Sequence, residues 1–301
     1  KVFLLYHLLI QLLKILLLFV VSKILELKLK ANEIRKETVK TIASIGVGHI
    51  GGSLSIADVM AVLYFDEMKV DPKNPKWDGR DWLVVSKGHS GPAIYSTLAI
   101  KGFFDREMLY TLNKPNTNLP SHCDMRKTPG IDMTTGSLGQ GASAAAGIAL
   151  GNKMDGKDDT YTYLILGDGE SQEGQVWEMA MFAAHRKLGN LIGFTDYNKL
   201  QIDGATDDVC SLGDIVAKYK AFGWDCVMVN GHDVAAIHDA IEAAKTVKDK
   251  PSMIILDTIK GKGISALEGK ASCHNANVNA EQCAEYVAEL DAEAEAIKEG
   301  K

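Results

Sequence analysis

Two oxygen-bearing side chains follow two apolar runs in the middle of the chain, at the point where each run ends. Asp168 comes after residues 162–166 and one glycine, and Asn198 follows residues 190–196. Carboxylate and carboxamide oxygens are ligands that Mg²⁺ accepts, and the ion often binds substrate phosphates at the same time. Gly169 lets the backbone approach an anion closely, and the helix predicted to follow it begins with free N–H groups. This part of the chain therefore predicts a site for a magnesium-bound diphosphate.

The Gly167-Asp168-Gly169 sequence, taken alone, is also compatible with a plain turn. Its combination with an asparagine at the end of the next apolar run favours the metal site, because ligands of parallel sheets bind at the carboxyl ends of the strands. The two interpretations differ in whether Asp168 and Asn198 meet in the folded chain.

Short apolar runs alternate with helical patterns from residue 31 onward, which indicates a parallel sheet covered by helices on both faces. The runs that indicate strands are residues 82–86, 162–166, 190–196, 226–230 and 253–258. The stretches that indicate helices are residues 31–44, 55–65, 93–101, 139–152, 176–188, 212–222, 234–246 and 280–299. Ser55 is placed to cap the second of these helices. We therefore expect an α/β fold, a doubly wound parallel sheet that forms one domain over residues 31–301.

The composition is that of an ordinary globular protein, with 46% hydrophobic and 24% charged residues in a chain of 301. A net charge of −6 gives no electrostatic reason to expect nucleic acid or an anionic membrane as a partner. The five cysteines are scattered and form no CxxC pair, which argues against a disulfide framework or a zinc cluster. The simplest location is a reducing cytoplasm.

The first thirty residues differ from the rest. Residues 2–21 are apolar except for His7, Gln11 and Lys14. Their length would span a bilayer, but a lysine near the middle would cost roughly 3 kcal/mol there. A helix with a narrow polar face, packed on a partner or on a membrane, is one interpretation, and a tail outside the fold is another. We favour a non-catalytic extension over residues 1–30 and consider a membrane anchor unfavourable.

Several further segments share a pattern with one enzyme family. They are Gly48–Gly52, Ser86–His89, Leu119–His122, Thr134–Gly141 and Leu188–Ile192. Together with the Asp168 and Asn198 segments, they occur in the order found in transketolases. From about Ala31 to His274 the chain resembles a transketolase, and the Gly167-Asp168-Gly169 to Asn198 segment resembles the motif that binds thiamine diphosphate.

The resemblance implies a cofactor site built from these segments. It assigns Asp168, Asn198 and the carbonyl of Leu200 to Mg²⁺, and Gly169 to the diphosphate. His89 and His274 match contacts to the diphosphate or the substrate.

The resemblance also implies contacts to the rest of the cofactor. In the Gly136-Ser137-Leu138 turn, the Gly136 carbonyl would lie near the aminopyrimidine and Leu138 against the rings. Ile202 matches a second apolar contact. Glu173 matches a glutamate at the subunit interface that couples the cofactor sites.

Four histidines fall in predicted loops, where their side chains can reach a ligand. His49, His122 and His274 match catalytic histidines that face the donor sugar, and His89 completes the set. Histidine donates to anionic oxygens and exchanges protons near neutral pH. The other four have structural interpretations: His7 in the extension, His185 and His238 within helices, and His232 in a turn or cap.

Two positions depart from the family pattern. His274 is followed by Asn275 where glycine is expected, so the alignment there is less firm. Ser137 replaces a proline often found in its turn, a change that the flanking Gly136 and Leu138 make tolerable.

One part of the expected chemistry has no residues here. The resemblance places the glutamate that activates the cofactor, and most groups that bind the sugar phosphate, in a second, pyrimidine-binding domain. The chain therefore resembles the N-terminal subunit of a split transketolase, and we expect a separate C-terminal subunit, with two copies of each chain. The expected reaction moves a two-carbon ketol unit from a ketose phosphate such as xylulose 5-phosphate to an aldose phosphate such as ribose 5-phosphate. Two alternatives stay open: an enzyme for an unusual sulfonated or branched sugar, and a non-catalytic cofactor-binding or regulatory subunit.

Overall fold

Five parallel strands form the centre of the fold, in the order β2-β3-β4-β8-β7. They are β2 (Trp82–Val85), β3 (Thr162–Gly167), β4 (Leu191–Tyr197), β7 (Asp225–Asn230) and β8 (Ser252–Asp257). The computed structural model describes the backbone of residues 2–300 and the side chains of residues 20–300. All five predicted strands are confirmed, because each observed strand matches its predicted range closely.

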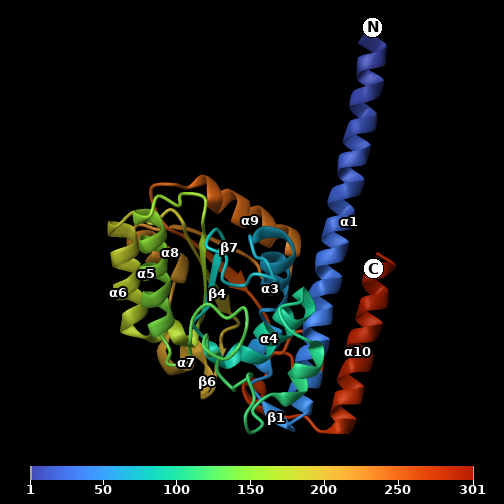
Figure 1. Ribbon diagram of the computed structural model, residues 1–301, viewed down its shortest axis with the longest axis vertical. Coiled ribbons are helices and arrows are strands. Elements are labelled where there is room, and N and C mark those ends of the chain that lie inside the picture. Colours follow the sequence, from blue (N-terminus) through green and yellow to red (C-terminus); the bar gives the residue numbers. More distant parts are fainter. Residues whose placement is uncertain (1, 301) are drawn as a thin grey trace.

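Helices cover both faces of this sheet (Figure 1). One face carries α1 (Val2–Ala43), α3 (Ala57–Val62), α4 (Gly91–Lys101), α9 (Val234–Thr246) and α10 (Ala280–Lys298). The other face carries α5 (Gln140–Met154), α6 (Gly174–His185) and α8 (Ile215–Ala221). Successive residues of β3 alternate between the two cores, with Tyr163 and Ile165 in one and Leu164 and Leu166 in the other. The predicted doubly wound α/β fold is therefore confirmed.

Short elements complete the described chain. They are α2 (Gly51–Leu54), α7 (Thr206–Cys210), the π-helical turn η1 (Leu63–Glu67), and the 3₁₀ turns η2 (Gly88–Ser90), η3 (Arg106–Thr111), η4 (Gly169–Gln172) and η5 (Ala271–Cys273). Two antiparallel ribbons join β1 (Val47–Gly48) to β9 (Ala276–Asn277) and β5 (Leu200–Gln201) to β6 (Gly204–Ala205). The first ribbon brings the segments that carry His49 and His274 together.

The helix predicted over residues 55–65 forms as α3 and η1, but its predicted cap is wrong. Ile56 is the N-cap residue, and its side chain makes no capping hydrogen bond. Ser55 instead donates its hydroxyl to the buried carboxylate of Asp196, with 2.7 Å between the oxygens. A buried carboxylate needs donors more than a helix end does, because an unmet buried charge is the costlier defect.

The first helix passes without a break through the boundary expected after residue 30. Leu27, Ala31 and Ile34 are all buried, at helical spacing. Lys23 Nζ donates to the carbonyl of Phe65 at 2.8 Å, so contacts with the domain begin upstream of residue 31. In Figure 1 the upstream part of α1 extends beyond the rest of the fold, and α10 lies along its downstream part.

The polar positions expected on the extension, His7, Gln11 and Lys14, lie outside the residues whose side chains the structure describes. The proposed polar stripe on this helix therefore stays a prediction. Over the described part of the chain, no helix combines the length and the hydropathy needed to cross a bilayer.

A buried ion pair joins the segment before β2 to the loop that precedes α5. Arg80 donates through Nε and Nη2 to Asp132 Oδ1, at 3.2 and 2.8 Å. Asp132 Oδ2 accepts from the amide of Leu83 at 3.0 Å. This carboxylate therefore serves two buried donors at once.

Asp132→Ala should destabilise the fold strongly, because it leaves the Arg80 guanidinium buried without a counter-charge. We expect the free energy of unfolding, measured by urea denaturation, to fall by about 3–5 kcal/mol. Asp78→Ala is the matched control, because Asp78 lies in the same segment as Arg80 but pairs with Lys157 at the surface. Equal losses in the two variants would contradict this account of the buried pair.

Candidate cofactor site

The carboxyl ends of β3 and β4, which are neighbours in the sheet, place Asp168 and Asn198 at one pocket of about 170 Å³. The Asp168 carboxylate accepts from the amide of Gly169 at 2.7 Å and from the amide of Lys199. The Asn198 carboxamide oxygen accepts from the amide of Leu200 at 3.1 Å. The three residues predicted as metal ligands, Asp168, Asn198 and Leu200, all line this pocket. If Gly167-Asp168-Gly169 formed only a turn, Asp168 and Asn198 would not need to lie at the same pocket.

The electrostatics of Asp168 fit a site for a cation. Its side chain is almost fully buried, and burial together with the nearby charge of Asp196 raises the pKa of Asp168 to about 7. Lys87 Nζ pairs with Asp196 instead, at 2.6 Å, and no ammonium or guanidinium group of the described residues pairs with Asp168. A divalent cation held by hard oxygen ligands would relieve this repulsion.

Two buried lysines line the pocket, and the sequence pattern assigned a role to neither. Lys87 Nζ donates to the carbonyl of Gly52 at 2.7 Å as well as to Asp196. Lys260 Nζ donates to the carbonyl of Leu200 at 2.9 Å and lies 3.1 Å from His274 Nδ1. Lysine is rarely buried, and although Lys87 lies in the Ser86–His89 segment that resembles the family pattern, nothing in the sequence indicates that these two lysines are buried. Their charges suit an anionic ligand.

The four loop histidines come together beside this pocket. The ring of His49 lies 5.4, 5.7 and 5.5 Å from the rings of His89, His122 and His274, and His89 lies 4.9 Å from His274, measured between centroids. Four segments distant in the sequence supply them, and the fold brings these four loops together. Burial is the main cause that lowers the pKa of His49 and His89, and burial with the charge of Lys260 lowers that of His274 to about 4.

The turn from Gly136 to Leu138 approaches the histidines closely. Gly136 has a φ of 146°, and a Cβ there would lie 3.0 Å from His122 Cδ2. Leu138 lines the pocket and is 37% exposed, and Ile202, which also lines it, is 64% exposed. The pocket is therefore polar within and has apolar side chains open to solvent, which suits a ligand with a charged end and a ring.

Glu170, a further residue without a predicted role, connects this turn to the loop that follows β3. Its carboxylate accepts from the amides of Gly139 and Gly167, at 2.8 and 3.0 Å, and from the hydroxyl of Ser86 at 2.5 Å. The side chain is buried, and burial raises its pKa. One carboxylate thus fixes the ends of two strands and the start of α5 relative to one another.

Some predicted residues do not line the pocket itself. His49, His122 and Gly136 adjoin it through the histidine group, and Ser137 is exposed. Glu173 is exposed at the N-cap position of α6, so its expected role at a subunit interface stays a prediction.

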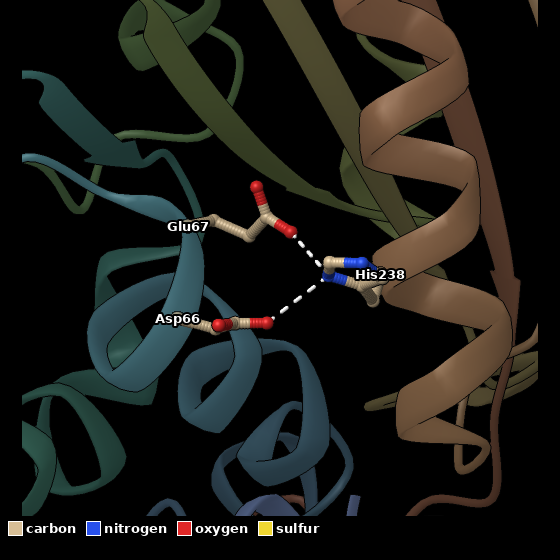
Figure 2. Close-up of side chains that lie close together, drawn as sticks. All are labelled: Asp66, Glu67 and His238. Carbon is tan, nitrogen blue, oxygen red and sulfur yellow. Dashed lines mark ion pairs between the residues drawn. The ribbon is translucent and has the colours of Figure 1, made fainter. Parts of the chain in front are cut away.

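A second group of ligating side chains, Asp66, Glu67 and His238, lies between η1 and α9 (Figure 2). His238 Nδ1 is 3.0 Å from Asp66 Oδ2 and 2.6 Å from Glu67 Oε1. Such residues can hold a metal ion, but Lys23 and Lys245 already pair with the two carboxylates. We interpret the group as an ion-pair cluster that joins α1, η1 and α9.

Comparison with known proteins bears on what the pocket holds. Residues 27–297 match the family model described as transketolase, thiamine diphosphate binding domain. The 6-deoxy-6-sulfo-D-fructose transketolase subunit SqwG of Clostridium sp. (strain MSTE9) is 56% identical over 89% of this chain and 98% of that subunit. An apulose-4-phosphate transketolase subunit of Phocaeicola vulgatus is 41% identical over 90% of this chain and 96% of that protein.

Solved structures share the fold. Transketolase from Leishmania mexicana superposes with a TM-score of 0.81 at 29% identity, and the match covers 91% of this chain and 46% of that one. A Pichia stipitis transketolase in complex with sedoheptulose 7-phosphate gives a TM-score of 0.80 at 34% identity, again over 91% and 46%. The chain therefore corresponds to slightly less than half of these transketolases.

Asp168→Ala should weaken binding of thiamine diphosphate in the presence of Mg²⁺, because it removes the charged ligand of the proposed metal. We expect the Kd to rise by more than about tenfold, which corresponds to about 1.4 kcal/mol, in calorimetric titration of the chain together with the expected C-terminal subunit. Asp203→Asn is the control, since Asp203 lies on the exposed loop between β5 and β6. An unchanged Kd for Asp168→Ala would show that the metal is bound elsewhere.

Proposed function

The chain belongs to the transketolase family, with the thiamine diphosphate binding domain over residues 27–297, and on this premise we propose that it is the cofactor-binding subunit of a two-chain transketolase acting on a sulfonated ketose. The observation that carries the proposal is 56% identity over 98% of a subunit named for 6-deoxy-6-sulfo-D-fructose. The convergence of the metal-binding loop and the four histidines supports a catalytic subunit over a regulatory one.

The two-chain arrangement is supported by the lengths of the relatives. Two proteins named as transketolase subunits align with this chain over 98% and 96% of their length. Single-chain transketolases align over less than half of theirs, for example 40% for Escherichia coli transketolase 2. In this proposal the partner supplies the glutamate that activates the cofactor and most groups that bind the sugar's anionic end.

The first task of this chain is to hold the charged end of the cofactor. Asp168, Asn198 and the Leu200 carbonyl would hold Mg²⁺, and Gly169 with His89 would contact the diphosphate. Lys87 and Lys260, which line the same pocket, would help to balance the negative charges of the diphosphate and the pocket carboxylates. Thiamine diphosphate, when bound, supplies the nucleophilic carbon that breaks the bond between C2 and C3 of a ketose.

The second task is proton transfer at the sugar. His49 and His274 are neutral near pH 7, because burial keeps their pKa values below the usual range. A neutral imidazole can accept the proton that leaves the donor's C3 hydroxyl and later return it to the new product. We assign this role to the group formed by His49, His122 and His274, with Leu138 and Ile202 packing against the cofactor rings.

The proposed substrate differs from the one first expected. Xylulose 5-phosphate and ribose 5-phosphate are the pair that the family resemblance implies, whereas two subunits that align over nearly their whole length are named for a sulfonated ketose and for apulose 4-phosphate. The alternative of an unusual sugar is therefore the better supported one. Removal of a two-carbon unit from 6-deoxy-6-sulfo-D-fructose leaves a four-carbon aldose that keeps the sulfonate.

Ketol transfer should require both chains. We expect the isolated chain to show no transfer from 6-deoxy-6-sulfo-D-fructose to an aldose phosphate, and the mixture with its partner to show transfer that depends on thiamine diphosphate and Mg²⁺. Product formation is followed by mass spectrometry, with the cofactor omitted as control. Activity of the isolated chain would contradict the two-chain arrangement, and an inactive complex would contradict the enzyme assignment.

The complex should prefer the sulfonate over the matched phosphate ester. We expect kcat/KM for 6-deoxy-6-sulfo-D-fructose to exceed that for fructose 6-phosphate by at least about tenfold, or about 1.4 kcal/mol. The physical reason is charge, because a phosphate ester carries between one and two negative charges near neutral pH and a sulfonate only one. An equal or greater kcat/KM for fructose 6-phosphate or xylulose 5-phosphate would overturn the substrate proposal.

A further inference from the structure

His232, expected to act only within a turn, joins two segments that are distant in the sequence. Its Nδ1 lies 2.8 Å from Asp58 Oδ2, in α3, and its Nε2 accepts from the amide of Ile259 at 2.8 Å. The side chain is 13% exposed. Both ring nitrogens are therefore engaged, one by a carboxylate and the other by the segment that follows β8.

These contacts fix which ring nitrogen carries the proton. The amide of Ile259 can only donate, so Nε2 must be the unprotonated nitrogen. The hydrogen therefore resides on Nδ1 and is donated to Asp58. This is the arrangement in which a carboxylate orients a neutral imidazole, and it leaves Nε2 free to hold one backbone amide in place.

Asp58 is itself held in its charged form. Arg35 donates to both of its carboxylate oxygens, and Arg35 Nε donates to the carbonyl of Leu54 at 3.3 Å. Burial opposes the charge on Asp58, but Arg35 and His232 outweigh it and lower the pKa of Asp58 below its usual value. The carboxylate is therefore a fixed acceptor for the imidazole.

The residue after Ile259 is the buried lysine of the cofactor pocket. Lys260 contacts the Leu200 carbonyl and His274 Nδ1, as described above. On its other side, the amide of Gly261 donates to the carbonyl of Gly51 at 3.0 Å. The backbone on either side of Lys260 is thus fixed by a hydrogen bond, and the upstream one depends on His232.

We propose that His232, oriented by Asp58, is a positioning residue that sets the Lys260 ammonium group in the cofactor pocket. Neither of its hydrogen-bond partners, Asp58 and Ile259, lines the pocket, whereas Lys260, the residue after Ile259, does. The inference rests on the proposed function, because it takes the pocket to bind a diphosphate whose charge Lys260 meets.

His232→Phe tests this role, because it keeps a ring in place and removes both hydrogen bonds. In the two-chain complex with Mg²⁺, we expect the Kd for thiamine diphosphate to rise about tenfold, equivalent to about 1.4 kcal/mol. His232→Gln should restore the Kd to within about threefold of the original, since its carboxamide offers an acceptor for Ile259 and a donor for Asp58. If His232→Phe fails to fold, His232→Asn, with a side chain too short to bridge both partners, gives the same comparison.

A double-mutant cycle with Lys260→Met separates positioning from general stability. If His232 acts through Lys260, the double variant binds thiamine diphosphate no more weakly than Lys260→Met alone. Asn32→Ala, which removes a buried contact between α1 and α10, should lower the melting temperature without changing the Kd. A full additional loss in the double variant, or an unchanged Kd in His232→Phe, would overturn the inference. Failure of the unaltered complex to bind thiamine diphosphate would instead overturn the proposed function.

Discussion

Two carboxylates stand at the ends of adjacent buried strands, where their charges must be balanced with almost no water. Asp196 is fully buried, and its carboxylate accepts hydrogen bonds from the side chains of Lys87, Ser55 and Thr258. Asp168 is 3% exposed and, among the described residues, accepts hydrogen bonds only from the backbone amides of Gly169 and Lys199. Because an unbalanced buried charge is costly, the Asp168 carboxylate is an acidic group whose charge an added cation would balance. The hydrogen bond that takes the Ser55 hydroxyl away from the helix end and the burial of Lys87 both serve to balance the charge of Asp196.

The rest of the site is arranged around that charge. Lys260 and the four histidines lie at the end of the pocket that is expected to bind an anion, while the Glu170 carboxylate joins the start of α5, just after the Gly136–Leu138 turn, to the end of β3. The apolar rim formed by Leu138 and Ile202 stays open to solvent. Rigid polar contacts on one side and an uncovered apolar rim on the other are what one half of a shared site would require. The chemistry proposed for the pair of chains thus follows from what this chain fixes and what it leaves uncovered.

The strands and the meeting of Asp168 with Asn198 could be predicted because their signals are local. Continuous apolar runs ended by polar residues mark β3 and β4, and the spacing of Asp168 and Asn198 follows from that order. Burial of particular charged residues could not be predicted, because Lys87 and Lys260 are buried by partners that come from other parts of the sequence. The same reason explains His232, whose neighbours in the sequence indicate a turn while its ring meets α3 and the segment after β8.

The central claim is that this pocket binds a diphosphate through a divalent cation, and titration of the two-chain complex with paired ligands tests it most directly. Thiamine diphosphate and thiamine share the same rings and differ only in the diphosphate. The account predicts saturable binding of thiamine diphosphate with Mg²⁺, and its loss both when the cation is removed by a chelator and when thiamine replaces the cofactor. Binding of thiamine diphosphate with the same affinity in the absence of any divalent cation would contradict it.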